Sequence, residues 1–354
     1  MRATMRRYPV LDHLASLTDD VGVIQHAVED VPDRSTGYCT DDVSRALMVA
    51  MAATEKPALR EVALQLAGRY LAFLYDAQIS DGRFHNFMGY DRRWLDIVGT
   101  QDSFGRALWA VGYGMRYAPR DSWKRVCRVI FERGFPVVAT LEYARSRAYS
   151  IIGMSHALAA HGTANDETLS HAIRCEAEAL ARLFDQHADA QWVWFEPFLT
   201  YDNARLSEAM LRAGALLGEE RFVRIGLATL SFYENVTVED RMFAPIGNQG
   251  WYPRGGTRAR FGQQPLEAAA MVDAALVAAD ISRDPHFADL AELAGDWYFG
   301  RNSFGAILVT DGGCRDGIDE HGISVNMGAE STLAYLSSAI ALAEPPVERL
   351  RIAR

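Results

Sequence analysis

The sequence predicts an all-α fold in which six helical hairpins form an inner and an outer ring of helices. Two observations carry this prediction: a repeated helix opening, and a regular asymmetry in the lengths of the connecting loops. The openings combine small residues with polar ones and recur roughly every 50–60 residues, which fits one helical hairpin per repeat. Each opening is marked by one residue: Arg45, Arg106, His156, Glu208, Glu267 and Glu330.

The stretches between the openings have the apolar periodicity of helices that pack on one side. In Ala58–Ala77, for example, Leu66, Tyr70 and Phe73 share one face, while charged residues occupy the other. These helices are therefore expected to form the outer ring. They are predicted at Val10–Ala27, Ala58–Ala77, Ser122–Tyr143, Glu167–Gln186, Glu219–Glu234 and Pro285–Phe299.

The helices that start at the openings are richer in Ala, Gly, Ser and Met. Asp41–Thr54, Asp102–Tyr117 and Gln263–Asp280 are apolar on most faces, which indicates interior helices. Outer and inner helices therefore alternate along the chain. We expect residues 1–354 to form a single domain, an (α/α)6 barrel.

The connecting loops differ in length in a regular way. Links from an inner helix to the next outer helix are short, and most links from an outer to an inner helix are long. Because all inner helices run in the same direction, the long loops should meet where those helices begin. Long ordered loops are usually functional, and helix N-termini present free N–H groups. We therefore expect a functional funnel at this end. The long links are Val28–Thr40, Gln78–Gln101, His187–Thr200, Val238–Gly262 and Gly300–Met327, with a shorter third link around Ala144–Ile151.

Composition restricts the partners. The chain has 354 residues and a net charge of −10, which argues against nucleic acid or an anionic membrane as the main partner. The sequence contains no run of 18 apolar residues, so no membrane-spanning helix is expected. The four cysteines form no Cys-x-x-Cys pair, so free thiols in the cytoplasm are expected. No metal or nucleotide motif occurs, so no cofactor is expected, and a homodimer is left open.

Six helical hairpins, with short loops on one face and aromatic and acidic loops on the other, resemble the (α/α)6 toroid of six-hairpin glycosidases. The resemblance covers essentially the whole chain. Families of that shape include inverting glycoside hydrolases, glycoside phosphorylases, unsaturated glycuronyl hydrolases, polysaccharide lyases and the N-acylglucosamine 2-epimerase group. The resemblance implies a saccharide in the funnel, but it does not choose the reaction, because one fold hosts several chemistries.

Carboxylates near the expected funnel are the candidate catalytic groups. Glycoside hydrolysis needs one protonated carboxyl group and one ionised one, and an aromatic wall raises the pKa of a carboxyl group. Glu196 follows Trp194 in a long loop and is expected to be the general acid. Asp42 or Asp102, each near the start of an inner helix, is expected to activate water. Its carboxyl group should lie about 6.5–9.5 Å from that of the general acid.

Other polar and aromatic residues in the loops are expected to bind the saccharide. A flat aromatic ring accepts the apolar face of a pyranose, and amide and guanidinium groups donate to hydroxyls. Pairing of Arg45 and Arg106 with Glu267 and Glu330 in a structural ring is an alternative for those glutamates. The expected substrate-binding residues are Asp41, His85, Trp194, Tyr201, Asp202, Trp251, Tyr252, Arg254, Gln263 and Glu330.

The sequence favours an inverting glycoside hydrolase that acts on an oligosaccharide or glycoside. Three alternatives stay open. A sugar isomerase or epimerase would need a histidine pair in the funnel, such as His85 with His156 or His321. A glycoside phosphorylase would use Arg254 to hold phosphate. A non-catalytic sugar-binding protein would have all of its funnel carboxylates paired with arginine.

Overall fold

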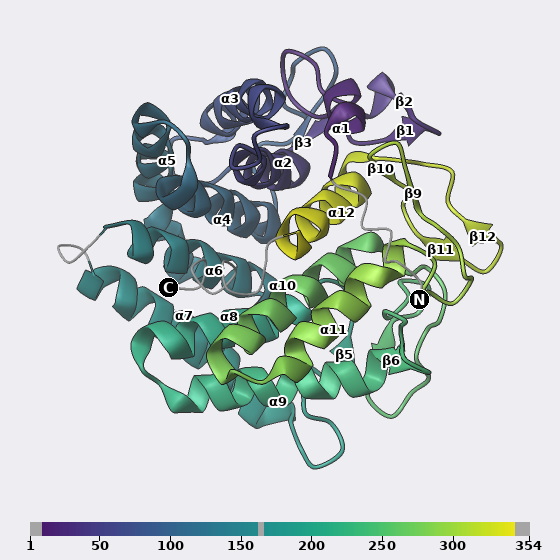
Figure 1. Ribbon diagram of the computed structural model, residues 1–354. Coiled ribbons are helices and arrows are strands. Elements are labelled where there is room, and N and C mark those ends of the chain that lie inside the picture. The colour runs from purple at the N-terminus through teal and green to yellow at the C-terminus, as the bar shows by residue number, and fades with distance from the viewer. Residues whose placement is uncertain (1–8, 162–165, 344–354) are drawn as a thin grey trace.

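The computed structural model describes residues 9–161 and 166–343. In these residues twelve α-helices form two concentric rings, and every strand belongs to a short two-stranded pair (Figure 1). The predicted fold class, an (α/α)6 barrel, is confirmed. Within the same ranges, no helix combines the length and the apolar character that crossing a bilayer would require.

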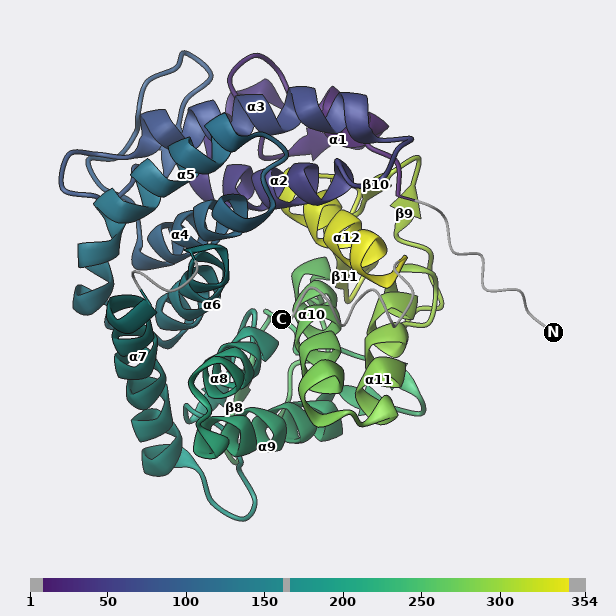
Figure 2. The same cartoon turned by 60° about the vertical axis from the view of Figure 1, so that its left-hand side comes forward.

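The inner ring contains six helices that all begin at the same end of the toroid. Each inner helix packs on the next, and the last packs on the first, which closes the ring (Figure 2). The inner helices are α2 (Thr40–Ala53), α4 (Gln101–Tyr117), α6 (Ala144–His161), α8 (Ala204–Leu217), α10 (Pro265–Ser282) and α12 (Ala329–Leu342).

The outer helices alternate with them along the chain. Five have the expected position to within a few residues at their starts, whereas the first is much shorter than Val10–Ala27. After that helix Asp19 forms a turn, because its carboxylate accepts the N–H groups of Val21 and Gly22. The outer helices are α1 (Asp12–Ser16), α3 (Arg60–Ala77), α5 (Asp121–Gly134), α7 (Asp166–His187), α9 (Glu220–Thr237) and α11 (Pro285–Gly295).

The third hairpin differs from the prediction at its turn. Helix α5 ends at Gly134 instead of continuing to Tyr143, and a 3-10 helix, η2 (Phe135–Thr140), follows it. Pro136 has no N–H group to donate to a helical carbonyl, so the α-helix cannot continue through it unchanged. Helix α6 therefore begins at Ala144, where the shorter third link had been expected.

Small residues bring two inner helices close together. A Cβ atom on Gly112 of α4 would collide with the carbonyl oxygen of Gly153 in α6, and one on Gly153 would lie 2.7 Å from the Trp109 Cα. A Cβ on Gly105 would lie 2.9 Å from the Ser146 carbonyl oxygen. The backbones of α4 and α6 can approach this closely only because glycine has no side chain.

The long loops and their strand pairs gather at the N-terminal end of the inner helices. All pairs are antiparallel, and β3–β4 and β5–β8 join loops from different repeats. The short links after α4, α8 and α10 lie at the other end, and residues 162–165, between α6 and α7, lie outside the described ranges. The pairs are β1 (Ala27–Val28) with β2 (Val31–Pro32), β3 (Tyr38–Cys39) with β4 (Phe87–Met88), β5 (Phe198–Leu199) with β8 (Tyr252–Pro253), β6 (Val238–Glu239) with β7 (Met242–Phe243), β9 (Val309–Thr310) with β10 (Gly313–Cys314), and β11 (Ile318–Asp319) with β12 (Gly322–Ile323).

Candidate functional site

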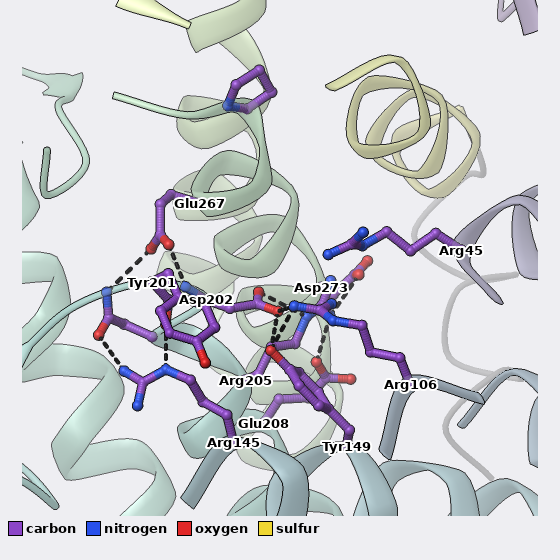
Figure 3. A network of polar contacts seen from close by, with 12 residues as sticks. Arg45, Arg106, Arg145, Tyr149, Tyr201, Asp202, Arg205, Glu208, Glu267 and Asp273 are labelled. Atoms are coloured by element: carbon purple, nitrogen blue, oxygen red, sulfur yellow. Dashed lines mark hydrogen bonds and ion pairs between the residues drawn. The ribbon is translucent and has the colours of Figure 1, made fainter. Parts of the chain in front are cut away.

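Buried arginines lie near the start of four inner helices. A cation is unfavourable close to the positive end of a helix dipole, and a buried one also needs a countercharge. Figure 3 shows that these side chains converge with carboxylates from other repeats. The four are Arg45 in α2, Arg106 in α4, Arg145 in α6 and Arg205 in α8.

Asp202 is the centre of this network. Its Oδ2 accepts hydrogen bonds from Arg106 Nη2 at 2.9 Å and from the Tyr149 hydroxyl at 2.7 Å, and Arg205 Nε lies 3.5 Å from Oδ1. Burial alone would raise the pKa of Asp202, but Arg106, Arg205 and Tyr149 together hold it below the usual value. The carboxylate is fully buried, so in this structure it presents no surface to a ligand.

Glu267 fixes the backbone that precedes α8. Asp202 has a φ of +52°, a left-handed conformation that is strained for most residues with a side chain. Its N–H group donates to Glu267, which also accepts from Asn203 Nδ2 at 3.2 Å and from the Tyr233 hydroxyl at 2.7 Å. Burial and the charge of Asp202 raise the pKa of Glu267 to about 7. Glu267 therefore anchors this segment.

Arg45 joins the first inner helix to the last. Its Nη1 lies 3.0 Å from Asp42 Oδ1, and its Nη2 lies 2.8 Å from Glu330 Oε2. The Arg45–Glu330 contact is one that the structural-ring alternative expects, whereas Arg106 pairs with Asp202 and Asp41 instead of Glu267. Burial raises the pKa of Asp42 to about 7, although Arg45 opposes this. Asp42 is thus buried in an ion pair with Arg45.

Three of the carboxylates expected from the sequence stay accessible at the loop-bearing end of the inner ring, which we call the mouth. We call Asp41, Asp102 and Glu330 the mouth carboxylates. They stand in the first turns of α2, α4 and α12, and the side chains of Asp41 and Glu330 are 24% and 37% exposed. Burial raises the pKa of Asp41 against the opposing charges of Arg106 and Arg45. Asp102 is half-buried and accepts a hydrogen bond from the Tyr201 hydroxyl.

Two of the expected aromatic residues lie beside Asp102. The Tyr201 ring has the Arg145 guanidinium carbon 4.7 Å from its centre on one side and the Trp251 ring 6.3 Å away. Trp251 is half-buried and has a φ of +57°. Left-handed backbone at a bulky residue is unusual and is found mainly where a site needs it. These two rings form an aromatic side of the mouth.

Two others pack against protein. Trp194 has no exposed surface, because Phe195, Phe232 and Tyr233 surround its ring. Tyr252 is half-buried, and its ring lies edge-on to that of Trp192 from the neighbouring long loop, with 5.3 Å between the ring centres. The tryptophan-rich loop thus contributes hydrophobic core in this structure, and Trp194 has no face free for a sugar.

Glu196 is held in an ion pair with a buried arginine. Arg145 Nη1 lies 2.8 Å from Glu196 Oε2, and the Glu196 side chain is only 16% exposed. The same guanidinium also donates to the Tyr201 carbonyl and to Asn203 Oδ1. Glu196 therefore holds the arginine that positions the segment before α8, an engagement that disfavours it as a proton donor.

The remaining candidates are dispersed. His85 is half-buried, stacks on Trp94 at 4.8 Å, and donates from Nδ1 to the Asp96 carbonyl at 2.8 Å. Arg254 is exposed and pairs with Asp189. Gln263 is buried and donates to the Arg260 carbonyl and the Ser303 hydroxyl, both at 2.9 Å, so its amide contacts protein groups.

Of the three histidines that an epimerase would need in pairs, one lies far from the mouth. His156 stands twelve residues into α6, about 18 Å from the helix start at 1.5 Å per residue, and therefore near the opposite end of the barrel. His321 is highly exposed in the turn between β11 and β12. His85 and His321 both belong to loops at the mouth end, so His156 is separated from each of its possible partners. Within residues 9–161 and 166–343, no group of three His, Cys, Asp or Glu side chains is placed to hold a metal ion.

A line of alternating charges crosses the barrel below the mouth. Glu208 Oε2 accepts from Arg205 Nη1 at 2.7 Å, and its Oε1 accepts from Arg212 Nε at 2.8 Å. Asp273 of α10 adds a second carboxylate to Arg205, also at 2.8 Å. We call this line the ion chain, and it runs in order through Asp41, Arg106, Asp202, Arg205, Glu208 and Arg212.

The site residues expected from the sequence did not include Arg145, Tyr149, Arg205 or Asp273. One signal was present: arginines recur within the first two turns of inner helices, where the helix dipole disfavours them. An arginine at such a position indicates that a carboxylate from another repeat neutralises it. Tyr149 and Asp273 lie inside helices whose composition is otherwise that of a hydrophobic core, so no sequence feature separated them from packing residues.

No protein-family model and no curated protein matches this sequence. Solved structures of similar shape include a sugar epimerase from a ruminal bacterium, at 13% identity and a TM-score of 0.72, over 95% of this chain and 97% of that chain. A cellobiose 2-epimerase from Bacillus thermoamylovorans is 12% identical, with a TM-score of 0.69 over 94% of this chain and 95% of that one. A GH76 α-mannanase from Bacteroides thetaiotaomicron is 8% identical, with a TM-score of 0.66 over 96% and 95%. At these identities the likeness is one of fold: the chain has the (α/α)6 toroid that these structures share.

Proposed function

We propose that this chain is a carbohydrate-active enzyme that hydrolyses a glycosidic bond, with inversion, at the mouth of the toroid. The observation that carries the proposal is the pair Asp41 and Asp102, two accessible carboxylates on adjacent inner helices in different surroundings. The likeness in fold to an α-mannanase and to sugar epimerases supports a saccharide as substrate.

Asp41 is the proposed proton donor. Burial raises its pKa, which is the direction that a general acid needs, and its partial exposure lets it reach a leaving-group oxygen. Asp102 is the proposed base. Its Oδ2 accepts the Tyr201 hydroxyl, which orients the carboxylate and leaves Oδ1 to take a proton from water. An inverting hydrolase needs this division of roles. The adjacent Trp251 ring is the proposed platform for a pyranose.

Substitutions of the two aspartates test these roles. Asp41→Asn should lower the hydrolysis rate of an unactivated glycoside by about 10²–10⁴-fold, which is the typical contribution of a general acid. It should cost much less on a nitrophenyl glycoside, because that leaving group needs little protonation. Asp102→Asn should lower both rates, because water activation does not depend on the leaving group. NMR of the first-formed product should show the inverted anomer.

Glu196→Gln is the matched comparison, since Glu196 was the acid expected from sequence. If Asp41 is the acid, the ratio of the Glu196→Gln hydrolysis rates on the unactivated and the nitrophenyl glycoside should equal the wild-type ratio. If Glu196→Gln selectively lost the unactivated reaction while Asp41→Asn retained it, the proton donor would be Glu196 and not Asp41. The circular dichroism spectrum of each variant should match that of the wild type, which shows that a loss of activity does not come from misfolding.

Sugar epimerisation is the second candidate, and one observation favours it. Because a carbonyl can only accept, His85 Nδ1 carries the proton in its contact with Asp96, so Nε2 of the neutral ring is an acceptor. Such a nitrogen could remove a proton next to a sugar carbonyl. Incubation of reducing disaccharides in heavy water tests this. Deuterium at C2 that His85→Gln abolishes would favour epimerisation, whereas hydrolysis without deuterium uptake would exclude it.

A further inference from the structure

A second polar hollow lies at the end of the barrel opposite the mouth. It is formed between α4, α6, α8 and α10, and its lining includes Arg116, His156, Arg212 and the apolar side chains of Leu216 and Val277. The space available to water-sized groups is about 30 Å³, roughly two water positions. The hollow therefore has room for the two oxygens of a small anion.

Its two arginines are incompletely neutralised. The Arg116 guanidinium lies 4.9 Å from the centre of the Tyr117 ring, and no carboxylate pairs with it in the part of the chain that the structure describes. Arg212 uses Nε to bind Glu208, which it shares with Arg205, so its terminal nitrogens are left for another acceptor. The positive charge of the lining therefore exceeds the negative charge near it.

His156 adds a buried polar group to the same hollow. It is only 3% exposed, and it contacts the rings of Tyr113 and Tyr117 at 5.3 and 5.8 Å. In the described residues its imidazole has no hydrogen-bond partner. Burial first, and then the charges of Arg212 and Arg116, hold its pKa well below the usual value. The same positive potential that opposes protonation of His156 attracts an anion.

We propose that this hollow binds a small oxyanion, either a carboxylate group or phosphate, between Arg116 and Arg212. Guanidinium groups present paired donors that match two oxygens of such an ion, and His156 supplies a neutral N–H donor. The helix ends at this face carry partial negative charge, which disfavours anions. Binding therefore depends on both arginines, and removal of either one should have a large effect.

Titration calorimetry of the full-length protein tests this, with sodium phosphate and sodium acetate as separate probes at constant ionic strength. We expect saturable binding of at least one probe, and the comparison distinguishes phosphate from a carboxylate. Arg116→Gln should weaken it by about tenfold or more, the usual effect of losing a charge-assisted hydrogen-bonded pair. Arg120→Gln is the matched control, because Arg120 is exposed outside the hollow and stacks on Trp123.

A second variant protects the test against misfolding. Ala159 lines the hollow but is itself exposed, so Ala159→Leu should fill the space without disturbing the core or any charge. It should abolish binding while Arg120→Gln leaves it intact. The proposal is overturned if the wild type binds neither probe, or if Arg116→Gln and Ala159→Leu both bind as the wild type does. Binding that survives both but disappears in Arg45→Gln would place the anion at the mouth instead.

Discussion

At the residue scale, a buried arginine of this ring can pair with a carboxylate that is distant in the sequence and comes close only because the ring closes. Arg106 pairs with Asp202, which is 96 positions away, because α4 and the start of α8 converge on the same central space. Asp202 was expected to bind the saccharide, but it has a left-handed backbone and a fully buried carboxylate. Residue type indicated polar chemistry at this end, but partner choice depends on side-chain directions that only the closed ring defines.

Glu267 gives the molecule a pH dependence whose sign follows from its raised pKa. The pKa of Glu267 is about 7 in the folded chain against 4.5 for an unperturbed glutamate. The folded state therefore holds this proton more tightly, so the associated stability is fully present below pH 4.5 and is lost as pH rises through 7. We expect Glu267→Gln to remove this part of the decline, on the order of 2 kcal/mol between pH 5 and 8.

Urea unfolding of wild type and Glu267→Gln at pH 5, 6, 7 and 8 measures the difference. Asp42 has a raised pKa of about 7 as well, so the variant should retain a smaller decline. Asp202 has a lowered pKa and titrates below this window, so it does not contribute there. Parallel pH profiles of the two proteins would show that Glu267 does not titrate as the structure implies.

At the element scale, the sequence predicted helices well where the periodicity was long and poorly where a turn residue intervened. Ala58–Ala77 matches α3 to within two residues at its start, because apolar residues recur there over five turns. The helix predicted at Ser122–Tyr143 instead ends at Gly134, because Pro136 follows. The first outer helix is cut short by the Asp19 turn. Local backbone chemistry overrode the periodicity in both cases.

The close contact between α4 and α6 requires glycine, and this requirement can be tested. Gly112→Ala would place a methyl group against the backbone of Gly153, which cannot move aside as a side chain could. We expect a loss of about 1–3 kcal/mol or more in the free energy of unfolding, as for other overpacked cores. Gly68→Ala in α3 is the control, because its added methyl meets only the Trp123 ring, at 3.3 Å.

Alanine is also the better helix former by about 1 kcal/mol, so Gly68→Ala should be nearly neutral or stabilising. Urea unfolding of both variants against the wild type gives the comparison. Equal stability of the two variants would mean that α4 and α6 can separate without cost, and the tight contact would then not be a requirement of the ring.

At the scale of the whole molecule, the repeat was the most informative feature of the sequence. Six openings implied six hairpins, and their common direction implied that the acidic and aromatic loops meet at one end, as they do (Figure 1). The sequence could not tell which carboxylates of that end stay accessible. Asp41 and Glu330 remain partly exposed while Asp42 is buried, a difference of helix face that one residue of register decides.

The ion chain connects the mouth of this ring to its opposite end, and Glu208 is its least exposed carboxylate beyond Asp202. Burial alone would raise the pKa of Glu208, but Arg212 and Arg205 hold it below the usual value, so the group is ionised in the folded protein. Glu208→Gln keeps the shape and removes the charge between the buried Arg205 and the half-buried Arg212. Breaking a buried pair in this way typically costs about 3–5 kcal/mol, because the remaining charges lose their counterion.

Glu178→Gln is the matched control, since Glu178 pairs with Arg221 at 3.2 Å but is 39% exposed, and such pairs contribute about 0–1 kcal/mol. Urea unfolding at pH 7 should separate the two variants clearly. If Glu208→Gln were no less stable than Glu178→Gln, Asp273 alone would suffice to neutralise Arg205, and the ion chain would not need Glu208 to hold the inner ring together.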